Sequence, residues 1–277
     1  MPSADVEVRV TQLTVYPVKG LAGQPREAVD VLKRGFAWDR RWMLIGEDQV
    51  FLSQRVLPKL ATIRAAVNGG ELSLSHEETR IGIPVEAPES ARRIQVTIWR
   101  DQVEGVLLPD VGQWLSGILN HHCDLVFMPE TTRRVVNPAF ARPGDIVGFA
   151  DAYPVLLIGE ASLADLNSRL STPVPIDRFR PNLVVSTDEP FEEDQWGEFE
   201  IGSAVLGGAK ASARCAVPTV DQLTGNRTGP EPIRTLSTYR RFGDGVYLGQ
   251  NLTVRQPGMI KLNDTVKLRG KITAIYA

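Results

Sequence analysis

The sequence contains few of the residues that build metal clusters and disulfide frameworks. Its 277 residues include 2 cysteines and 3 histidines. An iron–sulfur cluster takes four cysteine ligands, so this chain carries no such centre of its own. Cys123 and Cys215 could in principle pair, but in a chain of this length without a secretion signal we expect both thiols to be reduced.

Other signals are also missing. No run approaches the roughly 18 apolar residues that span a bilayer, and the first residues, MPSADVEVRV, resemble no secretion signal. With 31 basic and 33 acidic residues, the net charge of −2 gives no broad positive surface. P-loop, dinucleotide-binding and Ser-His-Asp patterns are absent. We therefore expect a cytoplasmic protein that binds neither nucleic acid nor membrane, and whose functional positive charge is local.

The residues that are present indicate an ordinary globular chain with one large or two medium domains, because 43% are hydrophobic and 23% charged. Asn68-Gly69-Gly70 predicts a hairpin turn, and apolar residues at helical spacing predict helices over 111–119 and 161–170. Alternation and short apolar runs predict strands at 6–10, 42–44, 50–52, 81–83, 94–98, 125–128, 155–158, 183–185, 199–201, 204–206, 252–254, 266–268 and 272–275. Many short strands and few helices favour a mainly β, barrel-like α+β fold.

Cys215 is the first candidate for chemistry. It lies in ARCAVPTVDQLTG (213–225), and the positive charge of Arg214 favours the thiolate, the form that attacks electrophiles and binds metals. A lone cysteine is often only a small buried apolar residue. Here, however, glycines and prolines crowd the following segment and predict an accessible loop, which Thr219 and Asp221 could hold through side-chain to backbone hydrogen bonds. The residues alone leave both a soft-metal ligand and a sulfur carrier open.

Several motifs occur together in a fixed order. They are YPVKG (16–20), WDRRWMLI (38–45), GEASLADLN (159–167), FRPNLVV (179–185), RCAVPTVDQLTG (214–225) and GQNL (249–252). Together they resemble the MOSC-domain family, in the branch that includes mitochondrial amidoxime-reducing components and bacterial YcbX-like proteins. The resemblance runs from about residue 10 to the end and implies an N-terminal β-barrel domain (1–125) followed by a β-barrel MOSC domain (126–277).

The resemblance also implies a molybdenum cofactor, in which a pyranopterin dithiolene and one protein cysteine ligate the metal. By this match Cys215 is the metal ligand, and soft thiolates suit such a metal. Arginine forks can hold the pterin phosphate, and an asparagine amide can bind the pterin edge. The implied cofactor-binding residues are Lys19, Gly20, Arg40, Asp151, Ala152, Tyr153, Arg180, Asn182, Ala213, Arg214 and Asn251.

Some positions stay open or depart from the family. Ala213 and Gly20 stand where the family has serines. Backbone N–H groups can still make the cofactor contacts of those serines, and the range of substrates stays open. Arg55 is either a surface charge or a further cofactor contact. His121-His122-Cys123 predicts a solvated helix end, because adjacent side chains cannot all face one ion. A pyridoxal-phosphate association is a further expectation that the resemblance brings for this chain.

The resemblance implies a molybdenum enzyme that reduces small N-hydroxylated compounds, such as amidoximes, hydroxylamines and N-hydroxylated bases. Electrons would come from a separate protein of the reductase or ferredoxin type, and the cofactor would carry the redox chemistry. Two alternatives are a sulfur-transfer module with a persulfide on Cys215 and a carrier of the molybdenum cofactor. The convergent lysines and arginines argue against the first, because a sulfur carrier needs only a thiol and a docking face.

Overall fold

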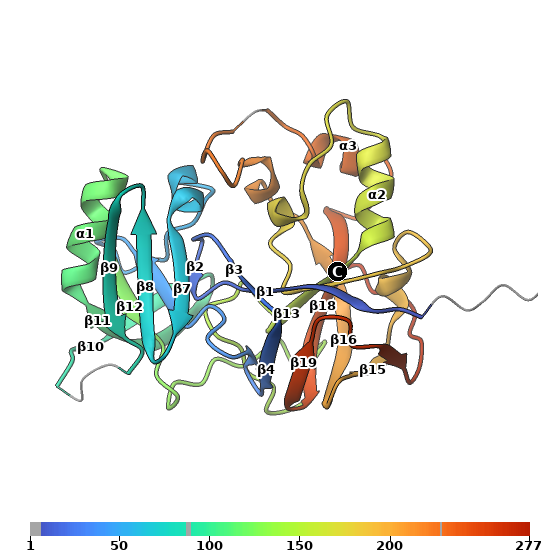
Figure 1. The fold of residues 1–277 in the computed structure, drawn as a ribbon, viewed down its shortest axis with the longest axis horizontal. Helices are drawn as coiled ribbons and strands as arrows, with labels where there is room; N and C mark the ends of the chain where they lie inside the picture. The colour runs from blue at the N-terminus through green and yellow to red at the C-terminus, as the bar shows by residue number, and fades with distance from the viewer. Residues whose placement is uncertain (1–6, 87–89, 228) are drawn as a thin grey trace, which may run out of the picture.

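The computed structural model describes residues 7–86, 90–227 and 229–277. Its largest sheet combines both ends of the chain (Figure 1). In sheet order its strands are β20 (Val266–Leu268), β15 (Glu198–Ile201), β16 (Ala204–Ala213), β18 (Gly245–Gln256), β13 (Val155–Gly159), β14 (Leu183–Val185), β1 (Val10–Val15) and β3 (Gln24–Arg26), with β17 (Arg241–Phe242) paired to β18. Their inward side chains, among them Leu13, Phe199 and Leu206, form one apolar core.

Three smaller sheets complete the described strands. The five-stranded sheet contains β10 (Arg93–Ile98), β11 (Asp101–Leu108), β12 (Asp124–Phe127), β6 (Trp42–Ile45) and β2 (Val18–Lys19). The hairpin sheet contains β7 (Arg64–Asn68), β8 (Glu71–His76) and β9 (Thr79–Pro84), and the third contains β19 (Gly258–Lys261), β4 (Ala28–Leu32) and β5 (Gly35–Phe36). A second core, which includes Trp42, Leu60 and Leu115, involves the five-stranded sheet and the hairpin sheet, whereas the buried residues of the third sheet belong to the first core.

The helices are short. They are α1 (Pro109–Leu119), α2 (Glu160–Ser168) and α3 (Ile233–Ser237), with 3-10 turns η1 (Pro58–Thr62), η2 (Ile176–Phe179), η3 (Glu192–Gln195) and η4 (Val217–Thr219). In Figure 1, α1 lies at one end of the molecule with β7 to β12, while α2 and α3 lie at the other. None of the helices in the described ranges is long and apolar enough to cross a membrane.

The mainly β, α+β fold class is confirmed. The sheet is open rather than closed into a barrel, since β20 and β3 end the strand order and no pairing between them is recorded over the described ranges. The free side of β3 faces β7, where the Gln24 side chain accepts a hydrogen bond from the Val67 N–H at 3.0 Å. Side-chain contacts therefore take the place of another paired strand at that edge.

Most expected elements are present, including the turn at 69–70 and both helices. Two expected strands are wrong, and a third, at 6–10, is misplaced, because Arg9 forms only an isolated bridge and the strand runs over Val10–Val15. Residues 50–52 form only isolated bridges, because the chain turns at Gln49 with a φ of 61°. Residues 272–275 form no strand, although the Ile275 carbonyl accepts a hydrogen bond from the Ala211 N–H at 2.9 Å. Val6, at the start of the first expected strand, lies outside the described residues.

The path of the first 40 residues positions the candidate site. β1 pairs with β14, and β4 pairs with β19, so this early segment packs on the second half of the chain. Directly after β1 the chain enters β2, which pairs with β6 and so belongs to the five-stranded sheet of the first half of the chain. Residues 16–20 therefore lie where the two halves meet, with the late strands on one side and the early sheets on the other.

One buried acid near β13 has a consequence for stability. Glu193 is fully buried; its carboxylate accepts hydrogen bonds from the Gly159 N–H at 3.1 Å and the Ser162 hydroxyl at 2.8 Å. Burial raises the pKa of Glu193 to about 7, from 4.5. Because the folded-state pKa is raised, ionisation destabilises the fold progressively as the pH rises from about 4.5 through 7, by about 3 kcal/mol in total.

We expect Glu193→Gln, a neutral mimic of the protonated acid, to unfold at a higher temperature than the wild type at pH 8, with the difference shrinking towards pH 5. Thermal unfolding of both proteins across this range measures the effect. The exposed Glu189→Gln serves as the control. An equal difference between the Glu193→Gln variant and the wild type at both pH values would contradict the assignment.

Candidate functional site

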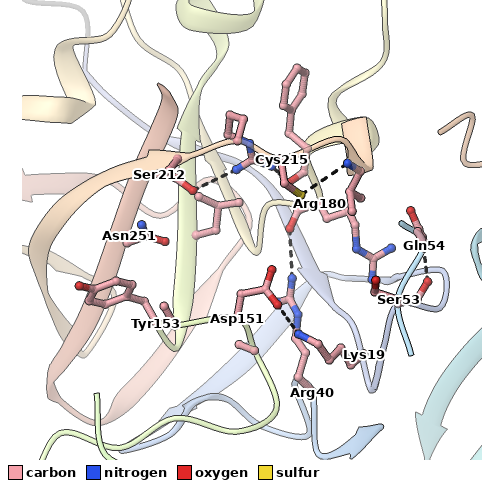
Figure 2. A pocket seen from close by; sticks show the side chains of 18 of the residues that line it. Lys19, Arg40, Ser53, Gln54, Asp151, Tyr153, Arg180, Ser212, Cys215 and Asn251 are labelled. Carbon is pink, nitrogen blue, oxygen red and sulfur yellow. Dashed lines mark hydrogen bonds and ion pairs between the residues drawn. The ribbon is translucent and has the colours of Figure 1, made fainter. Parts of the chain in front are cut away.

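A cavity of about 270 Å³ opens where the two halves of the chain meet, and all twelve sequence-predicted site residues line it. Figure 2 shows many of them converging from distant segments. The lining residues are Lys19, Gly20, Arg40, Ser53, Gln54, Arg55, Ala150, Asp151, Ala152, Tyr153, Leu156, Phe179, Arg180, Asn182, Lys210, Ser212, Ala213, Arg214, Cys215, Val217 and Asn251. The fold thus brings together residues up to about 230 positions apart in the sequence.

Cys215 follows the end of β16 and precedes η4, so it lies in a loop as expected. The residue is half-buried, and its thiol is not in a disulfide. The Val217 N–H points at the sulfur at 3.5 Å. Thr219 donates to the Ala216 carbonyl at 2.7 Å, and Asp221 accepts from the Thr224 N–H at 2.9 Å. These contacts confirm that both side chains hold the cysteine loop.

Arg214 lies beside the thiol and is held from two directions. Its guanidinium donates to the Ser212 hydroxyl at 3.1 Å and to the Phe179 carbonyl at 2.7 Å. Its Nε atom is buried without a hydrogen-bond partner in the described structure. Burial lowers the pKa of this arginine. A buried polar atom without a partner is costly, and an acceptor supplied by a ligand would remove that cost.

Asn182 connects the floor of the cavity. Its side-chain oxygen accepts from Arg40 at 2.8 Å and from the Leu156 N–H at 3.2 Å, while its nitrogen donates to the Thr14 carbonyl at 3.1 Å and to Asp39 at 2.8 Å. The two acceptor and two donor positions of its side-chain amide are therefore all used within the protein. In this structure Asn182 organises its neighbours, and a direct contact with a pterin stays a prediction.

Lys19 and Asp151 form an ion pair on one wall of the cavity. Burial lowers the pKa of Lys19, against the opposing effect of Asp151. Partial desolvation tends to raise the pKa of Asp151, whose side chain is still 61% exposed, but the Lys19 ammonium outweighs it and holds the value below its usual range. The Trp99 indole N–H also donates to Asp151, at 3.2 Å. Gly20, which follows Lys19, has a φ of +88°, a conformation that would strain a residue with a side chain.

The Asp151 loop is fixed from behind by Arg134. This buried guanidinium donates to the Gly148 carbonyl at 3.0 Å and to the Asp151 carbonyl at 2.9 Å. It also pairs with Asp101 at 2.6 Å, at the start of β11. The wall that carries Asp151 is therefore held by the early sheet, although Asp151 itself belongs to the second half of the chain.

The opposite wall contains residues that sequence reasoning missed. Lys210 and Ser212 alternate with Ala211 and Ala213 along β16, so Lys210, Ser212 and Arg214 lie at two-residue spacing, the period that puts strand side chains on one face. That spacing could have identified them. Tyr153 and Asn251 also lie here; the Tyr153 hydroxyl is buried without a partner in the described structure.

Arg55, which the sequence left open between a surface charge and a cofactor contact, lines the cavity. Its guanidinium carbon lies 4.2 Å from the centre of the Trp99 ring. Ser53 and Gln54, which also line the cavity, precede it in the same loop. Gln54 exchanges hydrogen bonds of 3.0 Å with Gln222, so this loop is joined to the cysteine loop.

His121, His122 and Cys123 form no site. Both histidines are exposed after α1, whereas Cys123 is buried against Ser116, whose hydroxyl accepts the Cys123 N–H at 3.0 Å. The expected solvated helix end is confirmed. Cys123 and Cys215 are both free, as expected.

The charge and donor chemistry of the cavity define what it can hold. Six cations line it, Lys19, Arg40, Arg55, Arg180, Lys210 and Arg214, against the single carboxylate of Asp151. Such an excess favours a ligand with several negative charges. No cluster of three or more His, Cys, Asp or Glu side chains that could hold a metal ion occurs in the described ranges. A metal bound at Cys215 must therefore bring its remaining ligands with it.

Comparison with known proteins agrees with this geometry. Residues 144–267 match the MOSC domain and residues 7–122 match the MOSC N-terminal beta barrel domain. Human mitochondrial amidoxime-reducing component 1 is 32% identical over 285 residues, covering 95% of this chain and 83% of the relative. The mouse protein of that name is 33% identical over 282 residues, with 95% and 82% covered. A rice molybdenum cofactor sulfurase is 28% identical over 264 residues, covering 88% of this chain and 32% of the relative.

Proposed function

Since this chain belongs to the MOSC family, in the branch that carries a MOSC N-terminal domain ahead of the MOSC domain, we propose that it is a molybdenum-cofactor-dependent reductase of small N-hydroxylated compounds. The single observation that carries this proposal is the placement of Cys215 in a cavity lined by six cations. The names of its relatives, amidoxime-reducing components and a molybdenum cofactor sulfurase, support a molybdenum-related role.

The residues present fit a pterin-borne metal. The Cys215 thiolate would hold molybdenum, for which a soft sulfur donor is suitable, and the pyranopterin would supply the other sulfur ligands. Bound there, the cofactor would supply the redox chemistry that reduces an N–O bond. The unpartnered Nε of Arg214 and the Tyr153 hydroxyl are groups that an acceptor-rich ligand would satisfy.

The chain's own side chains would bind and orient the cofactor and neutralise its negative charge. Arg40, Arg180 and Lys19 would neutralise the anionic group, and Asp151 would accept hydrogen bonds from ring N–H groups. The Cys215 loop, fixed through Asp221 to Arg178 at 2.9 Å, would keep the thiolate at one position. A ligand position fixed by surrounding hydrogen bonds is the usual way in which a protein controls a bound metal.

The proposed reaction consumes two electrons and two protons: an N-hydroxylated substrate yields the corresponding N–H compound and water. The N–O bond breaks, and the oxygen leaves as water. The two cysteines of this chain cannot hold an iron–sulfur cluster, so we propose that a separate redox protein of the reductase or ferredoxin type supplies the electrons.

Two further proposals complete this picture. We divide the chain into domains 1–125 and 126–277; the family matches lie on either side of this boundary, although β1 and β4 pair with later strands. A cytoplasmic location stays a prediction.

Benzamidoxime reduction by the protein from a host that makes molybdenum cofactor tests the proposal directly, with reduced methyl viologen as a small electron donor. We expect benzamidine to accumulate with the loaded protein and not with protein from a host that lacks the cofactor. Loaded protein that forms no benzamidine, from this or other amidoximes and hydroxylamines, would contradict the reductase function.

A sulfur carrier is the second candidate, because Cys215 has a half-buried free thiol at a cavity wall and one relative is named a molybdenum cofactor sulfurase. A persulfide on Cys215 would add the mass of one sulfur atom, removable by a reducing thiol. Intact-mass measurement on freshly purified protein without molybdenum distinguishes this candidate from the reductase.

A further inference from the structure

Two of the cavity's arginines share one aromatic ring. The guanidinium carbon of Arg40 lies 4.4 Å from the centre of the Tyr16 ring, and that of Arg180 lies 4.3 Å from the same centre. Arg40 precedes β6 and Arg180 follows η2, so the two come from distant parts of the chain. Tyr16 is 2% exposed and does not itself line the cavity. It thus underlies both cations without being a direct ligand contact.

The backbone around these three residues is tied together. The Arg40 N–H donates to the Tyr16 carbonyl at 2.7 Å, and the Tyr16 N–H donates to the Asp39 carboxylate at 2.8 Å. Arg40 also donates from its side chain to the Arg180 carbonyl at 3.2 Å. Both arginines have positive φ values, 47° and 56°, in the left-handed region that non-glycine residues seldom occupy. Such backbone strain often accompanies a functional arrangement.

The two like charges that share this ring repel, since Arg40 acts to lower the pKa of Arg180, and only one of them has a carboxylate partner. Arg40 pairs with Asp39 at 2.6 Å. The recorded acceptors of the Arg180 guanidinium are neutral oxygens, the Leu21 carbonyl at 2.7 Å and the Gln222 side chain at 3.3 Å. The negative face of an aromatic ring attracts guanidinium groups, most strongly where water is excluded. Tyr16 is therefore placed to offset the repulsion.

We propose that Tyr16 is a positioning residue that holds the Arg40 and Arg180 guanidinium groups together as a preformed pair for one anionic group, of the phosphate class. This inference rests on the proposed function only in identifying that anion with the phosphate of the cofactor. The phenol is not needed for the effect, because the ring face makes both contacts. The ring stays neutral, since burial raises the pKa of Tyr16 to about 12.

A calorimetric titration of the cofactor-free protein with inorganic phosphate measures the phosphate dissociation constant and tests the inference without any molybdenum. We expect Tyr16→Phe, which keeps the ring, to bind phosphate within about threefold of the wild type. Tyr16→Leu, which removes the ring, should bind it roughly tenfold more weakly or worse. Tyr16→Met fills similar space without a ring and replaces the leucine variant if that protein does not fold.

A double-mutant cycle separates positioning from general loosening of the fold. In an Arg180→Lys background, which keeps the charge but not the planar group, removing the ring should weaken phosphate binding much less than in the wild type. Equal phosphate affinity of wild type and folded Tyr16→Leu, additive effects in the cycle, or no phosphate binding by the wild type would each overturn the inference. Failure of the proposed function is read separately, from molybdenum and pterin content.

Discussion

Replacing Cys215 by serine should abolish molybdenum retention and lower benzamidoxime reduction by about 100-fold or more. Serine keeps the shape of the side chain but replaces the soft thiolate with a hard, protonated hydroxyl, which is a poor ligand for such a metal. Losing a supporting contact around a metal site already costs about 10- to 100-fold, and loss of the protein's own ligand should cost at least as much. Metal analysis and initial rates on the purified variant measure both effects.

The other cysteine provides the matched control. Cys123 is distant from Cys215 in the sequence. It is buried next to Ser116, just after the end of α1, and does not line the cavity. Cys123→Ser should therefore retain molybdenum and activity, at some cost in stability. A Cys215→Ser protein that keeps its molybdenum and its turnover would remove the cysteine from the metal site.

Arg180→Gln should show opposite effects on binding and on folding. Removing a partly buried cation that contacts an anionic ligand costs about 2 kcal/mol or more, so cofactor affinity should fall roughly 30-fold or more. The free energy of unfolding of the cofactor-free variant should nevertheless lie within about 1 kcal/mol of the wild-type value, or exceed it. The recorded hydrogen-bond acceptors of Arg180 are neutral oxygens, and a charge without a carboxylate partner adds little stability. Burial already lowers the pKa of this arginine to about 10.

Pterin fluorescence of the released cofactor and thermal unfolding of the cofactor-free protein measure these two effects. Arg169→Gln is the control, since Arg169 is exposed directly after α2 and pairs with Asp165 at 2.8 Å. Loss of pterin accompanied by an equally large loss of stability in the cofactor-free protein would mean that Arg180 serves the fold rather than the ligand.

Local sequence patterns predicted the elements well where packing follows them. The apolar spacing from Val111 to Leu119 gave α1, and Asn68-Gly69-Gly70 gave the hairpin between β7 and β8. The pairing of β1 with β14 and of β4 with β19 could not be predicted in this way. Strand partners depend on long-range packing, and a short alternating segment contains no information about which distant edge it joins.

The candidate site shows the same division. The family resemblance indicated twelve residues that the structure places around one cavity. It did not identify Tyr16 or Arg134, because neither residue lines the cavity and both act through others. Nor could the sequence show that the side-chain amide of Asn182 forms its hydrogen bonds with other groups of the protein. Roles of this kind depend on distances between segments that only the folded chain brings together.

The most direct test of the account is the molybdenum and pterin content of the wild-type protein, purified from a host that makes the cofactor. We expect near-stoichiometric amounts of both, because the cavity offers one thiol, an excess of cations and no complete set of protein metal ligands in the described ranges. Folded protein that carries neither molybdenum nor pterin would contradict the central claim.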